Sequence, residues 1–287
     1  MLHLIDAESM VAILGAADGR RPFDLAVDMF VGMPSFTAYG DPTFQAWMTS
    51  TPSGAVVDDT TGRGKESNRL ISRSSDAISM FTHTGTHVDA LNHFGYDGEI
   101  WNCFHEHDHM GARSWDVAGV DRHPPVLARG ILIDVAAAHG VETLPPGYAI
   151  GAAELRSVLA AQKTELRRGD VVLVRTGRIV HWPDEKAFVD DEPGIDLEGA
   201  RWLAEAGAVL IGADNVGLEA YPPDDEDNWS PVHAFLLAEA GVPIMEIVDT
   251  EELAGEGVRE FCFFGACIKI RGATGSPIRP VAFALRD

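Results

Sequence analysis

The sequence predicts an α/β fold, because segments with helical spacing of apolar residues alternate with short apolar runs that are typical of buried strands. A first helix is expected over residues 2–17, and later helices over 151–162, 196–206 and 231–240. Buried strands are expected at 131–135, 171–175, 209–212, 243–247, 261–264 and 266–270. Since the sequence shows no internal repeat or linker, we expect a single domain over residues 1–287.

A short segment between the first helix and these strands concentrates side chains that bind metals. Three histidines and one aspartate follow the order H-x-x-x-H-x-D-x-x-x-H, and they are His83, His87, Asp89 and His93. Neutral imidazoles and a carboxylate are ligands of zinc and manganese sites. Because four such side chains at this spacing rarely arise by chance, we predict a metal site here.

The residues between these side chains favour a strand preceded by a turn. β-Branched residues precede both His87 and Asp89, so an extended backbone would direct these two side chains onto one face. Gly85 can provide the bend that brings His83 beside them. A helix, as in H-E-x-x-H sites, is disfavoured because Thr-Gly-Thr separates the first two histidines. These three residues are therefore the predicted ligands, and His93 is the predicted proton shuttle.

This segment resembles the signature of the cyclase-like metal hydrolases, a family that includes bacterial kynurenine formamidases and isatin hydrolases. The pattern H-x-G-T-H-x-D-x-x-x-H-F is matched from His83 to Phe94. Shorter similarities follow in the same order at 32–34, 41–44, 233 and 241–246. The continuation over 92–102, which includes Trp101 and Asn102, is most similar to the isatin hydrolase branch.

The resemblance implies a role for each matched residue. The triad would bind Mn²⁺ or Zn²⁺, and His93 would be the catalytic acid/base. His233 and Glu246 match positions that either bind a second metal or shape the pocket, and the isatin hydrolase-like continuation favours a single catalytic metal. The loop over 214–219 lacks the Thr-Pro-Ser sequence of formamidases, which argues against formamidase specificity.

The resemblance also implies an architecture and an assembly. The expected architecture is a swivelling β/β/α fold, in which helices surround a central, mixed, barrel-like sheet, and the expected assembly is a dimer or tetramer. Residues 30–64 would cover the pocket. Aromatic side chains suit a flat organic substrate, and the pocket candidates are Phe36, Phe44, Trp47 and Trp101. The same aromatics would equally suit a hydrophobic core or a dimer interface.

Composition restricts the partners and the compartment. The 22 basic and 44 acidic residues give a net charge of −22, which repels nucleic-acid phosphates and anionic membranes. No apolar run reaches transmembrane length, and the first residues lack the pattern of a signal peptide. Three cysteines without a C-x-x-C pair indicate free thiols in a reducing compartment. We therefore expect a cytoplasmic protein that acts on a small molecule.

Other clusters of charged residues are interpreted as loops. His105, His107 and His109 alternate, so a strand would place all three on one face as a rival metal cluster. A polar loop is preferred, because no turn residue would make these side chains converge. The acidic clusters at 190–192, 224–227 and 251–252 lack the ligand spacing of an EF-hand and predict solvated loops.

The predicted site indicates a metal-dependent amidohydrolase. A metal bound by the triad would activate water, and His93 would carry the proton to the departing nitrogen. The expected reaction is hydrolysis of a C–N bond in a cyclic amide, either isatin-like or a lactam. Three alternatives remain: an aryl formamidase of the N-formylkynurenine type, a metal-dependent lyase or dehydratase, and a non-catalytic binding protein. The presence of His93 argues against the last of these.

Overall fold

The computed structural model of the chain describes residues 2–37, 40–59, 61–223 and 227–286. Within these ranges the strands are short. They are β1 (Phe23–Asp24), β2 (Gln45–Ser50), β3 (Ser75–Ser79), β4 (His87–Asp89), β5 (Glu99–Ile100), β6 (Phe104–His105), β7 (Val126–Asp134), β8 (Ala149–Ile150), β9 (Val171–Arg175), β10 (Gly194–Ile195), β11 (Leu210–Ala213), β12 (Ile244–Glu246), β13 (Glu260–Gly265), β14 (Gly275–Pro277) and β15 (Val281–Ala284).

The helices are α1 (Ala7–Ala16), α2 (Pro52–Asp58), α3 (Lys65–Arg69), α4 (Glu106–His109), α5 (Val135–His139), α6 (Ala152–Gln162), α7 (Glu185–Val189), α8 (Leu197–Glu205), α9 (Pro231–His233) and α10 (Glu251–Gly255). Shorter 3₁₀ turns are η1 (Leu2–Leu4), η2 (Trp101–Cys103), η3 (Val120–Arg122) and η4 (Arg178–His181). The chain continues α9 as a π-helix, η5 (Ala234–Ala240). None of the described helices is long and apolar enough to cross a lipid bilayer.

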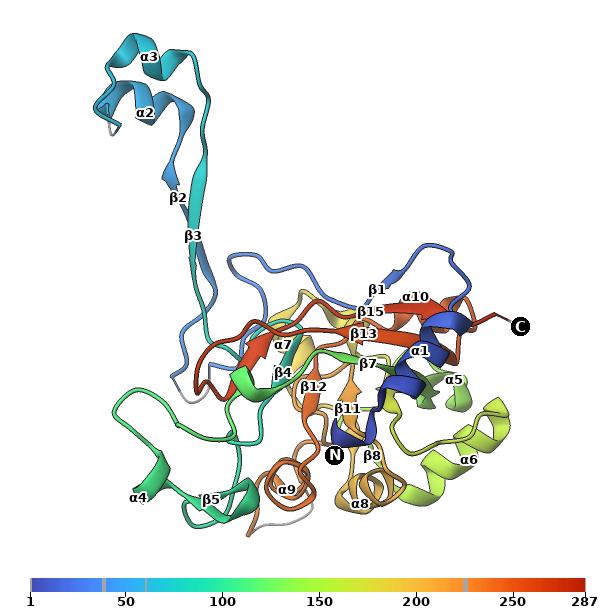
Figure 1. Ribbon diagram of the computed structural model, residues 1–287. Coiled ribbons are helices and arrows are strands. Elements are labelled where there is room, and N and C mark those ends of the chain that lie inside the picture. Colours follow the sequence, from blue (N-terminus) through green and yellow to red (C-terminus); the bar gives the residue numbers. More distant parts are fainter. Residues whose placement is uncertain (1, 38–39, 60, 224–226, 287) are drawn as a thin grey trace.

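Nine of the described strands form one curled sheet, around which the helices pack (Figure 1). Their order is β1-β15-β13-β7-β9-β11-β12-β4-β14. The central strands β7, β9, β11 and β12 are parallel, whereas β13 on one side and β4 on the other join them antiparallel. The α/β class and the mixed, barrel-like sheet surrounded by helices are therefore confirmed.

Both faces of the central strands are buried, which explains their continuous apolar runs. Side chains alternate between the faces of a strand. Ile131 and Ile133 of β7 pack in one hydrophobic cluster with the helices α6 and α8, whereas Leu132 packs on the opposite face with Phe261 and Phe263 of β13. The sheet thus separates two cores and provides a rigid support for β4 at its edge region.

Local structure differs from the sequence expectation in three places. The first helix begins only at Ala7, because the Asp6 carboxylate caps it by accepting from the Ser9 backbone N–H at 2.7 Å. Residues 266–270 form no described strand, because the partner strand β7 begins opposite Gly265. The segment that contains His105, His107 and His109 forms β6 and α4 instead of a loop. The His105 ring stabilises the start of α4 by accepting from the His107 backbone N–H at 3.1 Å.

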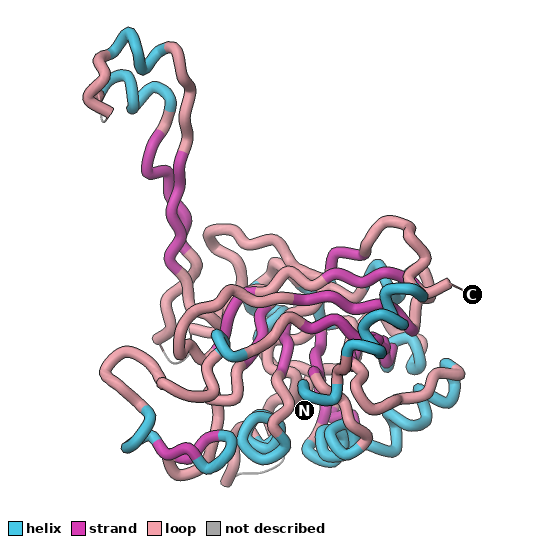
Figure 2. The backbone as a smooth tube through the Cα atoms, in the orientation of Figure 1, coloured by secondary structure: helices cyan, strands magenta, loops and turns pink. Residues whose placement is uncertain are grey.

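The region expected to cover the pocket divides into two parts. Near the body, Phe36 belongs to a segment that lines a cavity described below. Residues 45–79, in contrast, leave the body as an arm of two strands with two short helices at its tip (Figure 1). Antiparallel pairing of β2 with β3 carries the arm away from the body of its own chain (Figure 2), and the expectation that residues 30–64 cover the pocket stays a prediction.

The contact between β7 and β13 is tight enough to require a glycine. A Cβ atom at Gly130 would lie 2.0 Å from the Phe261 ring. We predict that Gly130→Ala lowers the free energy of unfolding by about 1–3 kcal/mol, because the ring has to move within a packed core. Urea denaturation of the purified protein measures this change.

Gly15 on α1 is the matched control, because a Cβ atom there meets no other atom within 4 Å. Gly15→Ala should raise the free energy of unfolding by about 0.5–1 kcal/mol, since alanine is the better helix former. Equal stability of the two alanine variants would contradict the packing described for Gly130.

Candidate metal centre

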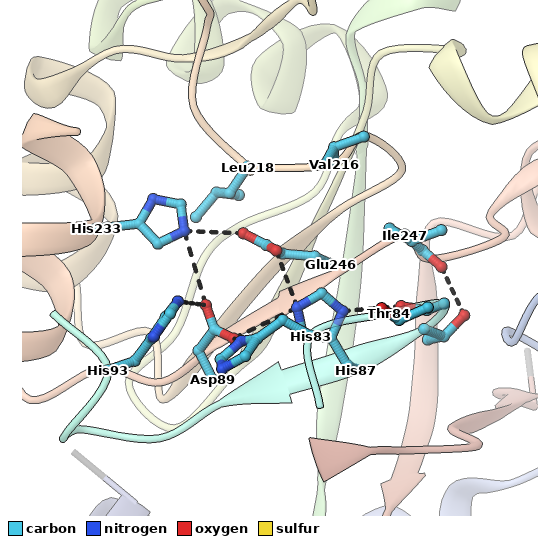
Figure 3. Close-up of polar contacts among 12 residues, drawn as sticks. His83, Thr84, His87, Asp89, His93, Val216, Leu218, His233, Glu246 and Ile247 are labelled. Carbon is cyan, nitrogen blue, oxygen red and sulfur yellow. Dashed lines mark hydrogen bonds and ion pairs between the residues drawn. The ribbon is translucent and has the colours of Figure 1, made fainter. Parts of the chain in front are cut away.

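The backbone around the histidine segment has the predicted shape. His87 and Asp89 lie at the ends of β4 and point to the same side, and Gly85 provides the bend with a φ of +65°. β4 lies between β12 and β14, and the register places Glu246 directly opposite His87. The bend brings His83 back over Asp89 (Figure 3). Two distant parts of the chain thus meet at one strand.

Asp89 is the centre of this cluster, and its two carboxylate oxygens face different partners. Oδ1 lies 2.6 Å from His83 Nδ1 and 3.4 Å from His87 Nε2. Oδ2 lies 3.7 Å from His233 Nε2, which in turn lies 2.9 Å from Glu246 Oε1. The predicted triad and the two distant residues are therefore brought together at one carboxylate.

The cluster contains two groups of three side chains whose ligand atoms could converge on a metal ion. One is His83, His87 and Asp89, and the other is Asp89, His233 and Glu246. In each group the ligand atoms lie within 4.8 Å of one another, and all three side chains are buried. Both groups combine imidazole with carboxylate, a set suited to zinc and manganese.

Outer hydrogen bonds orient each imidazole of the two groups. His87 Nδ1 donates to the Gly85 carbonyl at 2.8 Å, and His233 Nδ1 donates to Glu219 at 2.6 Å. For His83, Nε2 lies 2.9 Å from the Thr274 hydroxyl. If each of these nitrogens carries the proton, the other ring nitrogen has a lone pair directed at the carboxylates. Such outer acceptors are a regular feature of metal-binding histidines.

The electrostatics of the cluster favour a cation. Burial lowers the pKa of His87, but Asp89 and Glu246 outweigh this effect and raise the pKa to about 10. Burial likewise opposes protonation of His233, whereas Glu219 and Glu246 raise its pKa well above the usual value. The carboxylates thus hold positive charge at the site, a charge that a divalent ion would supply while the imidazoles stay neutral.

Two buried polar atoms test whether the site fits a metal. His87 Nε2 and Asp89 Oδ2 are fully buried and form no hydrogen bond with another described residue, although His87 Nε2 lies 3.1 Å from Glu246 Oε2. A buried polar atom without a partner is costly and uncommon in a native protein. Because both atoms face the centre of the cluster, a bound metal ion would satisfy them, and the residues present fit such an ion (Figure 3).

His93 lies beside the cluster as the sequence predicted. Its ring stacks on His83, with 3.8 Å between centroids, and its Nε2 lies 4.0 Å from Asp89 Oδ2. Burial, together with the positive potential of His83, holds the pKa of His93 well below its usual value. This shift favours the neutral imidazole, and His93 lines the cavity that leads to the site.

A cavity of about 830 Å³ opens onto the cluster. The residues that line it include His83, His93, His233 and Glu246, and aromatic walls are contributed by Phe36, Phe81, Phe94 and Trp229. The Phe94 ring contacts both Trp229 and His233, with centroid distances of 5.4 and 4.9 Å. Space for an aromatic molecule thus lies directly against the candidate metal ligands.

Of the four aromatics predicted for the pocket, only Phe36 is among the described residues that line this cavity. Phe44 is buried elsewhere, and Trp47 lies half exposed on the arm. Trp101 packs against Gly241, where an added Cβ would lie 2.6 Å from its ring. Aromatic composition alone did not distinguish these locations, because core packing, arm and pocket all use large apolar side chains.

Two buried carboxylates beside the site escaped the sequence interpretation. Glu219 accepts from His233 Nδ1 and also from the Ser230 hydroxyl at 2.7 Å, so it holds the ring in place. Glu192 was expected in a solvated loop, yet it is buried at the cavity and accepts from the Val216 backbone N–H at 2.6 Å. Burial raises the pKa of Glu192 well above its usual value. Neither residue belongs to a local sequence motif, because each makes its contact at the site with a residue that is distant in the sequence.

The rival cluster of three histidines does not form a metal group among the described residues. The His105 and His107 rings stack, with centroids 4.8 Å apart, whereas His109 pairs with Asp116 at 3.0 Å. Of the other acidic clusters, Glu251 accepts a hydrogen bond from the buried Arg175 at 2.7 Å. Asp224, Asp225 and Glu226 lie outside the described residues.

Comparison with known proteins identifies relatives of this geometry. The family model named Cyclase matches residues 23–220, a range that contains the histidine segment. The chain is 26% identical to Cyclase-like protein 3 of Arabidopsis thaliana over 238 residues, which cover 80% of this chain and 74% of the plant protein.

Solved structures share the fold. A crystal structure of a novel cyclase is 30% identical, with a TM-score of 0.86, and the match covers 98% of this chain and 94% of that chain. An isatin hydrolase bound to the product analogue thioisatinate has a TM-score of 0.69 at 19% identity, with 98% and 100% coverage. Isatin hydrolase A from Ralstonia solanacearum has a TM-score of 0.71 at 20% identity, with 98% and 97% coverage.

The central position of Asp89 leads to a prediction on metal content. Asp89→Ala should abolish metal binding, because each of the two groups would keep only two of its three ligands. Elemental analysis of the purified variant measures the loss. Glu192→Gln is the matched control, since it changes a buried carboxylate of the same cavity outside both groups and should keep the metal. Full metal occupancy in Asp89→Ala would overturn the ligand assignment.

Elemental analysis also distinguishes one bound metal ion per chain from two. If the second group binds an ion, His233→Ala and Glu246→Ala should each lower the metal content from about two ions per chain toward one. If these residues only shape the pocket, both variants should keep the wild-type content.

Proposed function

The chain belongs to the cyclase family, and from the geometry of its site we propose that it is a metal-dependent hydrolase that cleaves the C–N bond of a cyclic amide. One observation carries this proposal: buried ligand atoms that form no hydrogen bond among the described residues face the centre of a cluster that adjoins both His93 and an aromatic cavity. The shared fold of isatin hydrolases, one of them with a bound product analogue, supports the choice of an isatin-like or lactam substrate.

We assign two metal ions to the two groups of residues that share Asp89. His83, His87 and Asp89 would hold one ion, and Asp89, His233 and Glu246 would hold a second. Since the two oxygens of Asp89 face different groups, the geometry favours two ions over the single ion that the Trp101-Asn102 continuation suggested. Divalent Mn²⁺ or Zn²⁺ bound there would polarise the amide carbonyl and activate water for attack.

His93 is assigned the proton transfer. Its neutral imidazole lines the cavity beside the ligands and can accept the proton of the attacking water. The water oxygen adds to the carbonyl carbon, and the C–N bond then breaks as His93 returns the proton to the departing nitrogen. A cyclic amide opens in this way to one product with both a carboxylate and an amine.

The cavity favours a flat and uncharged substrate. Its aromatic walls provide stacking surfaces, and the charged residues of its lining include Asp41, Asp190 and Asp191 against Lys186. These carboxylates repel an anionic substrate and favour departure of the carboxylate product. This charge pattern supports a neutral cyclic amide as the substrate.

Activity and isotope incorporation test the reaction. The metal-free protein, reloaded with Mn²⁺ or Zn²⁺, should hydrolyse isatin or a simple lactam faster than N-formylkynurenine. In ¹⁸O-labelled water the product carboxylate should gain solvent oxygen, because hydrolysis forms a new C–O bond. Turnover without label would indicate a lyase or dehydratase, and preference for N-formylkynurenine would indicate an aryl formamidase.

The proton-transfer role of His93 is tested separately from metal binding. His93→Ala should keep its metal and lose activity by about a hundredfold or more, the scale expected for loss of a general acid/base. Elemental analysis and the rate on the best substrate are measured on the same sample. A variant that loses its metal would show instead that His93 is a ligand, and an unchanged rate would exclude it from catalysis.

A further inference from the structure

Glu192 is a buried carboxyl on the wall of the cavity that takes no part in the reaction proposed above. The residue is only 6% exposed, yet it lines the cavity together with His233 and Glu246. It belongs to neither group of candidate metal ligands. Because burial of a polar group is costly, a buried carboxyl that faces a substrate cavity is a candidate for contact with the substrate.

Hydrogen bonds from a neighbouring loop fix the position of Glu192. The Tyr221 N–H donates to the Glu192 carbonyl at 2.9 Å, and Asn215 Nδ2 donates to the next carbonyl along the chain at 2.7 Å. The side-chain oxygen Oε2 accepts from the Val216 N–H at 2.6 Å. These three bonds connect the segment to residues 215–221, so the carboxyl has a fixed orientation at the cavity.

The second carboxyl oxygen of Glu192, Oε1, is available to a bound molecule. It forms no hydrogen bond with another described residue, and no described cation forms an ion pair with it. Arg178 lies close enough to lower the pKa of Glu192, but it donates to the backbone carbonyls of Phe188 and Asp190 instead. One oxygen of the carboxyl is thus held by the protein, and the other is not.

Gly217 allows Oε1 to approach the candidate metal ligands. An added Cβ at this glycine would lie 2.8 Å from Glu192 Oε1 and 3.9 Å from His233 Cε1. The carboxyl and the His233 ring therefore line adjoining parts of the cavity wall. A substrate whose amide carbonyl is held at the metal ligands would place its neighbouring ring atoms near Oε1.

The surroundings of Glu192 favour its neutral form. Burial raises the pKa of this carboxyl well above its usual value, and the nearby Glu246 adds to this effect, although the bond from the Val216 N–H opposes it. A neutral carboxyl has one O–H donor and one carbonyl acceptor. Because Oε2 already accepts from the Val216 N–H, the proton belongs on Oε1, and the group presents an O–H donor at the cavity wall.

We propose that Glu192 is a specificity-determining residue whose Oε1 donates a hydrogen bond to a carbonyl oxygen of the substrate other than that of the scissile amide. This inference rests on the proposed function of the same site and narrows its substrate class to flat cyclic amides with a second carbonyl group. An analogue without that oxygen would leave a buried donor without a partner, and a polar site of this kind rejects such an analogue.

Binding of two carbocyclic ketones to the metal-loaded protein tests this role without any turnover. Indane-1,2-dione has two adjacent carbonyl groups, 2-indanone has one, and neither contains a C–N bond that could be hydrolysed. Isothermal titration calorimetry gives both dissociation constants, and their ratio measures the preference for the second carbonyl. We expect the wild-type protein to bind the dione about tenfold more tightly, the scale of one hydrogen bond to a buried group.

Variants at residue 192 identify the source of this preference. Glu192→Gln keeps a neutral donor of the same shape and should keep the preference for the dione. Glu192→Leu should lose it, with about tenfold weaker binding of the dione and unchanged binding of 2-indanone. Glu185→Leu is the matched control, because it removes an exposed carboxylate from the lining of the same cavity and should leave both dissociation constants unchanged.

Three results would overturn the proposal. The same preference in the wild type and in Glu192→Leu would show that Glu192 does not contact the second carbonyl. Loss of the preference in Glu192→Gln would show that an ionised carboxylate is the binding group, and parallel weakening of both ketones in Glu192→Leu would leave Glu192 only a structural role. Since no turnover is needed, each result stays separate from the ¹⁸O test of the proposed function.

Discussion

The Asp89 carboxylate is a fully buried charge, and such a group is stable only where positive partners surround it. Its Oδ1 faces His83 and His87, and its Oδ2 faces His233. Burial alone raises its pKa, but the surrounding imidazoles lower the pKa well below the usual value, so the group stays ionised. Both candidate metal groups depend on this anion, because Asp89 belongs to each of them.

The sheet makes that burial possible. β4 lies between β12 and β14, so backbone hydrogen bonds on both sides hold His87 and Asp89 in register with Glu246 and Gly275. The small residue at 275 matters, because an added Cβ would lie 2.5 Å from the His83 ring. Outer acceptors such as Glu219 then orient the rings. Rigid strands and second-layer hydrogen bonds together hold the ligand atoms in place.

The body and the arm differ in how far their apolar side chains are buried. The body places its apolar runs on two faces of one sheet and covers both with helices and strands. The arm has two strands and no covering layer in the single chain, so its apolar residues remain at the surface. Apolar side chains thus stabilise the fold of the body, whereas those of the arm remain exposed in the single chain.

The sequence alone determined the α/β class, the central buried strands and the extended segment at His87 and Asp89, because these features follow from local periodicity and from residues such as Gly85. It also marked His233 and Glu246, but only through family resemblance. Tertiary structure decided that these two residues meet Asp89, that Glu219 and Glu192 face the site, and that Trp47 lies on an arm instead of in the pocket. These features depend on strand register and on contacts between distant segments, which have no local pattern in the chain.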